Sequence, residues 1–373
     1  MVAVHALAAA EVRKGCRVEV FTTDRNGDRR LELPTGRVAE LDGVRVNYFK
    51  TKSLRPFAYS RDMMAALHRR VPDADIVHIH GLYTYPTWAG GHQARRVGKP
   101  YVLSPRGMLD PHAIQRRRRL AKLAYIMAVE GHNIRNASVV HFTTPEELDL
   151  ARRVIRIRNS CVIENAVPFD ASLVELNKGC THKFWPELAG KRMVLFVGRI
   201  DPKKGLELAL DAFAEVAGTD RSIHLVVAGE GDRRYVEGLK QQARSLGLAT
   251  RASFVGFVQG QEKAALLADA TVFVLPSYSE NFGNSVVEAM AAGIPVVVSN
   301  RVNLAGRVQT AGAGIVADCS PASIAAALRK LLHDANALRK AGAAGRELAS
   351  NYTDAAPIAD EMVRIYDKVL SEQ

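Results

Sequence analysis

Residues 271–298 constrain the fold more than any other stretch, because they pass through three kinds of local structure within a short distance. A continuous run of β-branched and apolar residues at 271–275 is typical of a strand buried on both faces. Residues 285–292 predict a helix that stops at Gly293, and residues 295–298 predict a second buried strand. Such alternation runs through both halves of the chain and predicts an α/β protein with two doubly wound parallel sheets.

The polar loop at 276–284 is a candidate ligand site. It has nine residues, whereas strand-to-helix loops in α/β units usually have about 2–6. Glu280 and Gly283 lie in it, and Glu288 follows in the predicted helix. Carboxylates beside the free N–H groups of a helix start suit a polyhydroxylated ligand. Two alternatives stay open: Ser285 and Glu288 also fit a capping box, and Glu280 also fits a solvated loop carboxylate.

A second apolar strand, predicted at 193–197, leads into a loop with two cations. Gly198 and Arg199 are followed by four residues and then by Lys204 and Gly205, before a helix. Cations after a strand can stabilise the negative charge that develops on a departing diphosphate. Two solvated loop cations are the alternative. The order of residues differs from that of a Walker A loop.

These two segments resemble the signature of family 4 glycosyltransferases, which have the GT-B fold. The resemblance is carried by Glu280 and Glu288, with seven residues between them, and by the Gly-Arg and Lys-Gly pairs within 198–205. It implies three catalytic residues: Arg199 and Lys204 on the donor diphosphate, and Glu280 on the sugar. The donor-binding residues that it implies are Gly198, Gly229, Phe257, Val258, Asn281, Phe282, Gly283 and Glu288.

The resemblance also implies a reaction. This is a retaining, metal-independent transfer of a sugar from a UDP- or GDP-linked donor to an acceptor hydroxyl, without a cofactor. Two rival hypotheses stay open, namely a nucleotide-sugar epimerase on the same fold and a non-catalytic nucleotide-sugar-binding protein. Asp73 and Asp75 form an Asp-x-Asp triplet, but they precede a predicted strand, where charged residues mark the solvent edge. We therefore expect no metal site there.

Three residues of the first half are candidates for the acceptor side. His80 ends a predicted strand, although a lone histidine there equally suits a core or loop position. Arg106 stands where many relatives have the histidine of a Pro-His-Gly motif, and His112 lies nearby. Arginine cannot act as a base near neutral pH, but it can hold a phosphate or a carboxylate. We therefore expect an anionic acceptor.

Positive charge is concentrated in the first half of the chain. Residues 1–170 hold 28 Lys and Arg against 17 Asp and Glu, whereas the remainder holds 23 against 22. Much of the excess lies in 115–123, which predicts a basic helix. A solvated face and a surface for anionic lipid or a phosphate-bearing acceptor both fit this pattern. The expected partners are a nucleotide-sugar donor, a glycan or lipid-linked acceptor and an anionic membrane surface, rather than nucleic acid.

Apolar runs and cysteines bear on localisation. No apolar run approaches the ~18 residues that a membrane-spanning helix needs. The four cysteines show no metal or redox spacing, which suits a reduced compartment. We therefore expect a cytoplasmic protein, or one that is peripheral at the inner membrane face, in cell-envelope polysaccharide or glycolipid biosynthesis.

The GT-B resemblance implies two Rossmann-like domains that face an interdomain cleft. We assign residues 1–170 to the acceptor domain, 171–190 to a linker and 191–355 to the donor domain, and residues 356–373 to a helix that crosses back. In the family, a strand and a glycine-rich turn precede the first helix, whereas this sequence opens at the helix. We therefore expect the first strand to be missing, through a misassigned start or a truncation.

Overall fold

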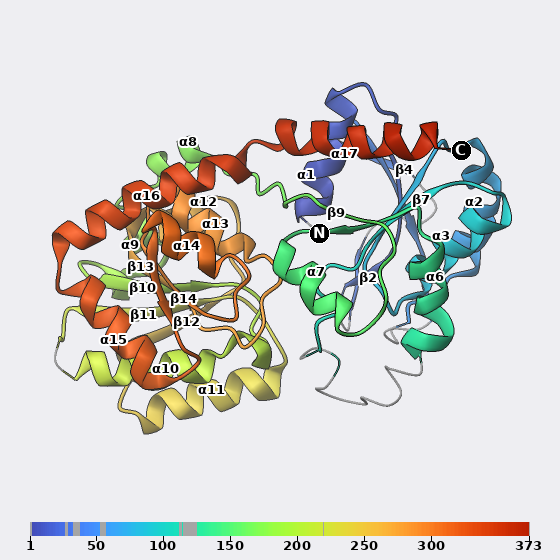
Figure 1. The fold of residues 1–373 in the computed structure, drawn as a ribbon. Coiled ribbons are helices and arrows are strands. Elements are labelled where there is room, and N and C mark those ends of the chain that lie inside the picture. The colour runs from blue at the N-terminus through green and yellow to red at the C-terminus, as the bar shows by residue number, and fades with distance from the viewer. Residues whose placement is uncertain are drawn as a thin grey trace. The chain divides into compact units, whose positions relative to one another are not determined.

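The chain folds into two compact units (Figure 1). The computed structural model describes residues 2–26, 29–32, 38–52, 57–111, 114, 125–218 and 220–372. Met1–Ala166 and Ala355–Gln373 form the first unit, and Val167–Asp354 forms the second. Each unit contains a sheet of parallel strands with helices packed against it, which confirms the predicted α/β class.

The second unit is built on a six-stranded sheet in the order β12-β11-β10-β13-β14-β15, and every neighbouring pair is parallel. The strands are β10 (Arg192–Val197), β11 (Ile223–Ala228), β12 (Ala252–Gly256), β13 (Ala270–Leu275), β14 (Val296–Ser299) and β15 (Gly314–Ala317). The chain winds outward from β10 in one direction and from β13 in the other. The order therefore reverses between these two strands, and α/β folds bind ligands at such a point.

Helices cover this sheet and bury its strands almost completely (Figure 1). They are α10 (Leu206–Ala217), α11 (Arg233–Ser245), α12 (Gly260–Asp269), α13 (Asn284–Ala291), α14 (Ala305–Ala311), α15 (Pro321–Leu332) and α16 (Ala335–Thr353). The central strands have buried side chains on both faces. This explains why their sequences are continuous apolar runs rather than alternating ones.

The segment predicted as a linker, residues 171–190, is folded into the second unit instead. It forms α8 (Ala171–Leu176), α9 (Thr181–Phe184) and a 3₁₀ turn. The carboxylate of Asp269 at the end of α12 accepts hydrogen bonds from the backbone N–H groups of Gly179 and Thr181, at 2.6 and 3.0 Å. The sequence of the segment has little helical periodicity, so these tertiary contacts with α12 stabilise its structure instead.

The first unit divides its parallel strands between two sheets, which differs from the single doubly wound sheet that the sequence predicts. One sheet has the order β1-β5-β4 and the other β6-β7-β8-β9. The strands are β1 (Glu19–Thr23), β4 (Val38–Leu41), β5 (Val44–Phe49), β6 (Val77–His80), β7 (Tyr101–Ser104), β8 (Val139–Phe142) and β9 (Ser160–Val162), with a short β2 (Arg25–Asn26) and β3 (Arg29–Arg30) pair. Among the described residues, β1 and β6 each have a hydrogen-bonded neighbour on one side only.

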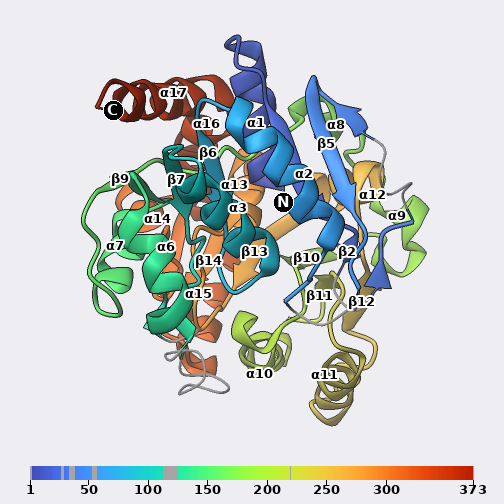
Figure 2. The same ribbon diagram turned by 90° about the vertical axis from the view of Figure 1, so that its right-hand side faces the viewer.

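The helices of the first unit include the two ends of the chain. They are α1 (Val2–Arg13), α2 (Arg61–Arg70), α3 (Tyr85–Arg96), α6 (Gly131–Asn136), α7 (Pro145–Arg152) and α17 (Ala355–Ser371). Figure 2 shows α2 and α3 next to each other on the side that faces the viewer. Helix α17 packs on α1 through a small apolar cluster that contains Leu7, Ile358 and Met362.

A partly buried network of hydrogen bonds crosses the β6-β7-β8 sheet. His141 Nε2 lies 2.8 Å from the carbonyl oxygen of Ile163, which can only accept, so Nε2 carries the proton. Nδ1 of His141 must then accept from the hydroxyl of Ser104, at 2.8 Å. The Ser104 oxygen in turn accepts from Nε2 of His78, at 2.7 Å. The carbonyl of Ile163, which can only accept, therefore fixes the neutral tautomers of both histidines.

At the other end of this network, the number of available protons fixes the protonation state of Glu11. Nδ1 of His78 lies 2.7 Å from the hydroxyl of Tyr366, which lies 2.8 Å from a carboxylate oxygen of Glu11. Tyr366 has one proton and cannot donate to both neighbours. All bonds are satisfied at once with both groups neutral when the Glu11 carboxyl donates to Tyr366 and Tyr366 donates to His78. Consistently, burial raises the pKa of Glu11 to about 7. Once the carboxyl ionises it can only accept the hydrogen bond that it shares with Tyr366, and this acceptance opposes the shift.

We expect Glu11→Gln to stabilise the protein at pH 8.5 but not at pH 4.5. The folded pKa of Glu11 lies above its ordinary value of 4.5. Its contribution to stability is thus fully present below pH 4.5 and is lost as pH rises towards 7. The loss is about 3 kcal/mol at most. Denaturant unfolding at the two pH values measures it, with exposed Glu146→Gln as the control. An equal gain at both pH values would contradict the proton count.

Candidate active site

Two loops meet at the point where the strand order of the second unit reverses. One follows β10 and the other follows β13, and these strands are paired with Val194 opposite Val272 and Leu195 opposite Phe273. The carboxyl ends of parallel neighbours lie at the same edge of a sheet. The two segments that the sequence singled out independently are therefore brought side by side.

The loop after β10 is shaped by a cap and a glycine. The side chain of Asp201 accepts a hydrogen bond from the N–H of Lys203, at 3.0 Å, and begins a 3₁₀ turn. Gly205 ends that turn with φ at 65°. A Cβ atom on Gly205 would lie 2.3 Å from the carbonyl oxygen of Pro276, so only glycine allows the two loops to approach this closely. The N–H of Tyr278 donates to the carbonyl of Lys203 at 2.8 Å and joins them further.

Lys204 and Glu280 form an ion pair between these loops, and each side chain is only 12% exposed. The backbone of Glu280 is fixed by the segment after β14. Its N–H donates to the carbonyl of Arg301 at 3.0 Å, and its carbonyl accepts from the N–H of Asn303 at 3.1 Å. The structure thus brings together two of the three predicted catalytic side chains. The backbone of Arg301 and Asn303 fixes the position of Glu280.

Arg199, the third predicted catalytic residue, lies in a different environment. Its side chain is 69% exposed, and its closest carboxylate oxygen, on Asp201, is 3.9 Å away. The arginine therefore keeps most of its donors available to a ligand. Burial is the largest cause that lowers the pKa of Lys203, and the charges of Lys204 and then Arg199 lower it further. The loop after β10 is consequently rich in positive charge.

Two predicted glycines are in backbone contact. A Cβ atom on Gly229 would lie 1.8 Å from the carbonyl oxygen of Gly198, and Gly229 has φ at 148°. The N–H of Gly229 donates to the carbonyl of Gly256 at 2.6 Å. These glycines let the turns after β10, β11 and β12 pack against one another beside the site.

We expect Gly229→Ala to destabilise the protein by about 3 kcal/mol, because the new methyl group collides with backbone that cannot move freely. Gly238→Ala is the matched control. Gly238 lies within α11, where a Cβ atom would meet nothing within 4 Å. The control should gain up to about 1 kcal/mol from helix propensity. Chemical unfolding of both variants measures the difference, and equal effects would contradict the packing of the two glycine turns.

Phe257 and Val258 follow β12 and face opposite environments. Phe257 is 62% exposed, whereas Val258 is buried in the core of the unit. An exposed phenyl ring at the carboxyl edge of the sheet presents a flat apolar surface to a ligand. Between these two donor-binding candidates, only Phe257 offers its side chain.

After Glu280, the loop before α13 offers backbone groups at the start of the helix. Phe282 is 2% exposed, and its ring packs edge-on against Tyr352 with a centroid distance of 5.5 Å. Gly283 is the N-cap of α13 with φ at 89°. The first N–H groups of α13 therefore follow directly after Asn281, Phe282 and Gly283. Such groups have no partner within the helix.

Glu288 lies in the second turn of α13, because the helix already begins at Asn284. The capping-box alternative is wrong for the same reason: Gly283 is the N-cap, and Ser285 lies inside the helix. The Glu288 carboxylate instead accepts a hydrogen bond from Nζ of Lys263 on α12, at 2.6 Å. Lys263 was not predicted from the sequence, since no local motif marks a partner 25 positions away.

The predicted acceptor residues of the first unit are partly brought together. His80 ends β6, and its Nδ1 accepts from Nη2 of Arg106 at 3.1 Å. Nη1 of Arg106 donates to the side-chain oxygen of Asn165. Burial lowers the pKa of His80 well below its ordinary value, and the charges of His78 and Arg106 act in the same direction. His112 and the basic segment 115–123 lie outside the described residues.

Metal ligands and membrane-spanning helices can be assessed for the described part of the chain. Within it, no group of three or more His, Cys, Asp or Glu side chains is arranged to hold a metal ion. None of its helices is both long enough and apolar enough to span a membrane.

Two family models together match most of the chain. Residues 2–166 match the glycosyl transferase 4-like domain, and residues 181–348 match glycosyl transferases group 1. The matched parts include both donor loops as well as His80 and Arg106. The chain belongs to the group 1 glycosyltransferases.

Similar proteins support this family and the GT-B fold. Glycogen synthase of Mycobacterium tuberculosis is 34% identical over 217 residues, which is 56% of this chain and 51% of that protein. This glycosyltransferase chain thus spans about half the length of the curated relatives it matches first. Sucrose-phosphate synthase of Thermosynechococcus elongatus has the same fold, with a TM-score of 0.77 at 24% identity over 99% of this chain and 93% of that one. Anabaena HepE, solved with UDP and glucose, follows with 0.75 at 18% identity, over 94% of this chain and 100% of that one.

Proposed function

We propose that this glycosyltransferase moves a sugar from a nucleoside diphosphate donor to an acceptor hydroxyl. The Lys204–Glu280 ion pair carries the proposal, because it places one cation and one carboxylate, both nearly buried, at the reversal point of the sheet. Exposed Arg199 adds a second cation on the same loop. Two cations suit a diphosphate, and a carboxylate suits sugar hydroxyls.

In the proposed step, the bond between the anomeric carbon and the diphosphate oxygen breaks, and its electron pair goes to that oxygen. Arg199 and Lys204 stabilise this charge as it develops. The acceptor oxygen bonds to the anomeric carbon on the face that the diphosphate leaves, and its proton passes to the diphosphate. This route retains the anomeric configuration and needs no metal. Lys204 would exchange Glu280 for the phosphate, which frees the Glu280 carboxylate for the sugar.

For the donor nucleotide, we propose uridine diphosphate, because the similar HepE structure contains UDP and glucose. In this chain, the ribose hydroxyls would donate to Glu288, whose position is fixed by Lys263. The base would stack on Phe257. A guanosine-linked donor is the alternative to be tested beside it.

We expect Phe257→Ala to weaken UDP binding by about tenfold or more, since stacking of a base on an aromatic ring is worth ~1–3 kcal/mol. Stability should change little, because the ring is mostly exposed. Calorimetric titration with UDP measures the effect. The control is Phe184→Ala, which removes another partly exposed ring of the second unit. Unchanged UDP affinity in Phe257→Ala would contradict the stacking role.

For the acceptor, we propose an anionic glycan or lipid-linked sugar of cell-envelope biosynthesis. The basic first half of the chain supports this, as does Arg106 beside His80. Association with the inner membrane face is part of the proposal. Flotation with anionic vesicles at low salt tests it, and failure to bind them would refute the membrane part.

A thermal-shift screen of UDP- and GDP-linked sugars tests the donor assignment. A ligand at 100 times its dissociation constant adds about 2.7 kcal/mol of stability. The best donor is then incubated with and without acceptor sugars. Release of free nucleoside diphosphate supports the glycosyltransferase, whereas a new sugar nucleotide without acceptor supports the epimerase. Binding without any turnover supports the non-catalytic alternative.

A further inference from the structure

The β1–β5 ribbon of the first unit has two faces of opposite character. Val44 and Val46 point to one side, where they join an apolar cluster with Ala8 and Ala9 of α1. Successive side chains in a strand alternate between faces, so Arg45 and Asn47 point to the other side. That second face lies opposite α2.

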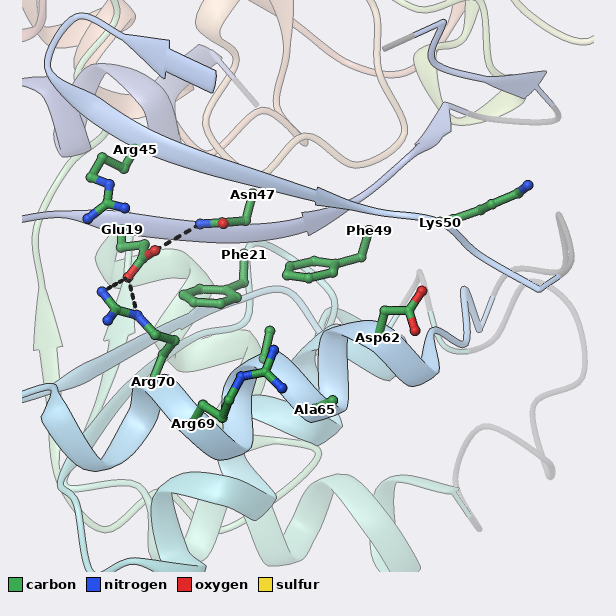
Figure 3. A pocket seen from close by; sticks show the side chains of 11 residues that line it. Glu19, Phe21, Arg45, Asn47, Phe49, Lys50, Asp62, Ala65, Arg69 and Arg70 are labelled. Carbon is green, nitrogen blue, oxygen red and sulfur yellow. Dashed lines mark hydrogen bonds and ion pairs between the residues drawn. The ribbon is translucent and has the colours of Figure 1, made fainter. Parts of the chain in front are cut away.

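A hollow of about 740 Å³ separates this second face from α2 (Figure 3). We call it the α2 trough. Phe21 and Phe49 form its aromatic wall, with parallel rings inclined by 6° and centroids 5.8 Å apart. Figure 3 shows the side chain of Arg69 reaching from α2 toward these rings. The trough thus combines a flat apolar surface with a cation.

The charges of the trough leave an excess of positive groups. Glu19 is neutralised by Arg70, with a shortest distance of 2.8 Å, and also accepts from Asn47 at 3.1 Å. Three further cations line the trough, whereas Asp62 is its one further carboxylate. The side chains of these cations are exposed, and among the described residues they form no hydrogen bond or ion pair, although the charge of Arg45 helps Arg70 to lower the pKa of Glu19: Arg45, Lys50 and Arg69.

We propose that the α2 trough binds a sugar that carries a phosphate group. The partly exposed ring of Phe21, which is backed by the buried ring of Phe49, offers apolar area to the face of a sugar ring. Arg45 and Arg69 offer the charged donors that phosphate prefers. Asp62 can accept from sugar hydroxyls. None of these residues belongs to the donor site of the second unit, and the inference stands independently of the proposed transfer reaction.

The test measures binding of three probes to the full chain by calorimetry: glucose 6-phosphate, glucose and inorganic phosphate. We expect glucose 6-phosphate to bind at least about tenfold more tightly than either other probe, because only it engages both the rings and the cations. Arg69→Gln should weaken it about tenfold. Arg61→Gln is the matched control, since Arg61 is exposed on the same helix but does not line the trough.

Several results would overturn the proposal. Equal affinity for glucose 6-phosphate and inorganic phosphate would show that the sugar does not contribute to binding. Equal weakening by Arg61→Gln and Arg69→Gln would show that binding depends on the overall positive charge of α2 and not on the trough. Binding of phosphatidylglycerol vesicles but not of glucose 6-phosphate would identify a membrane surface instead. The UDP thermal shift of Arg69→Gln should equal that of the unmodified chain. A failure of the trough is thereby distinguished from a failure of the donor site.

Discussion

Lys204→Ala is expected to lower turnover of the best nucleoside diphosphate sugar by about a hundredfold to a thousandfold. This is the usual cost of removing one donor that stabilises charge in a transition state. The ammonium group is nearly buried and already held at the reversal point of the sheet, so solvent screens it little. The UDP thermal shift of the variant should also largely disappear. Steady-state kinetics and the shift assay measure the two effects.

Folding must be separated from catalysis in this test, because Lys204→Ala leaves the Glu280 carboxylate without its cation. Loss of one partner from a buried pair is strongly destabilising, and about 2 kcal/mol is expected here for a pair that is still partly solvated. Lys204→Met combined with Glu280→Gln removes both charges and should recover most of that stability but none of the activity. Exposed Lys330→Ala serves as the charge control. Full activity in Lys204→Ala would overturn the phosphate role.

Local sequence patterns were sufficient to predict the strands and loops of the second unit. Its central strands are continuous apolar runs, because the parallel sheet buries both of their faces. The loops after β10 and β13 contain glycines that the close approach requires, such as Gly205 beside Pro276. The Lys204–Glu280 pair then follows from strand order, since β10 and β13 are neighbours.

Features that depend on tertiary packing were not predicted. The pairing of Lys263 with Glu288 joins two helices and leaves no mark in either sequence. The α2 trough requires the second face of the β1–β5 ribbon to lie opposite α2, which periodicity alone does not specify. The predicted linker 171–190 likewise gains its structure from contacts with α12.

The cluster of three histidines in the first unit was only partly anticipated as well. His80 was considered singly, whereas the structure places its ring 4.1 Å from that of His78, measured between centroids. His141 belongs to the same group, with its ring centroid 5.8 Å from that of His78. Burial lowers the pKa of all three, to about 3 for His141, and the guanidinium of Arg106 adds to each shift. Burial also lowers the pKa of His224 in the second unit, but the first unit has three such imidazoles and is therefore expected to be the more sensitive to acid.

The first unit should therefore unfold in acid before the second. A folded pKa below the ordinary value of 6.5 means that stability is present above pH 6.5 and is lost as pH falls. As pH falls, each histidine lowers the free energy of unfolding by up to about 1.4 kcal/mol per pH unit. Between pH 7 and 4.5, protonation of Glu11 in the folded state offsets the effect of one of the three histidines. The net loss approaches about 3 kcal/mol per unit, a large share of a typical domain's total stability.

The two tryptophans separate the units, because Trp88 lies in the first and Trp185 in the second. In an acid titration, the emission maximum of Trp185→Phe should shift to the red near pH 5, at a higher pH than that of Trp88→Phe. His80→Gln should reduce the pH slope by about 1.4 kcal/mol per unit, whereas exposed His132→Gln should leave it unchanged. Coincident transitions of the two tryptophans, or equal slopes for the two histidine variants, would show that the buried imidazoles do not set the acid limit.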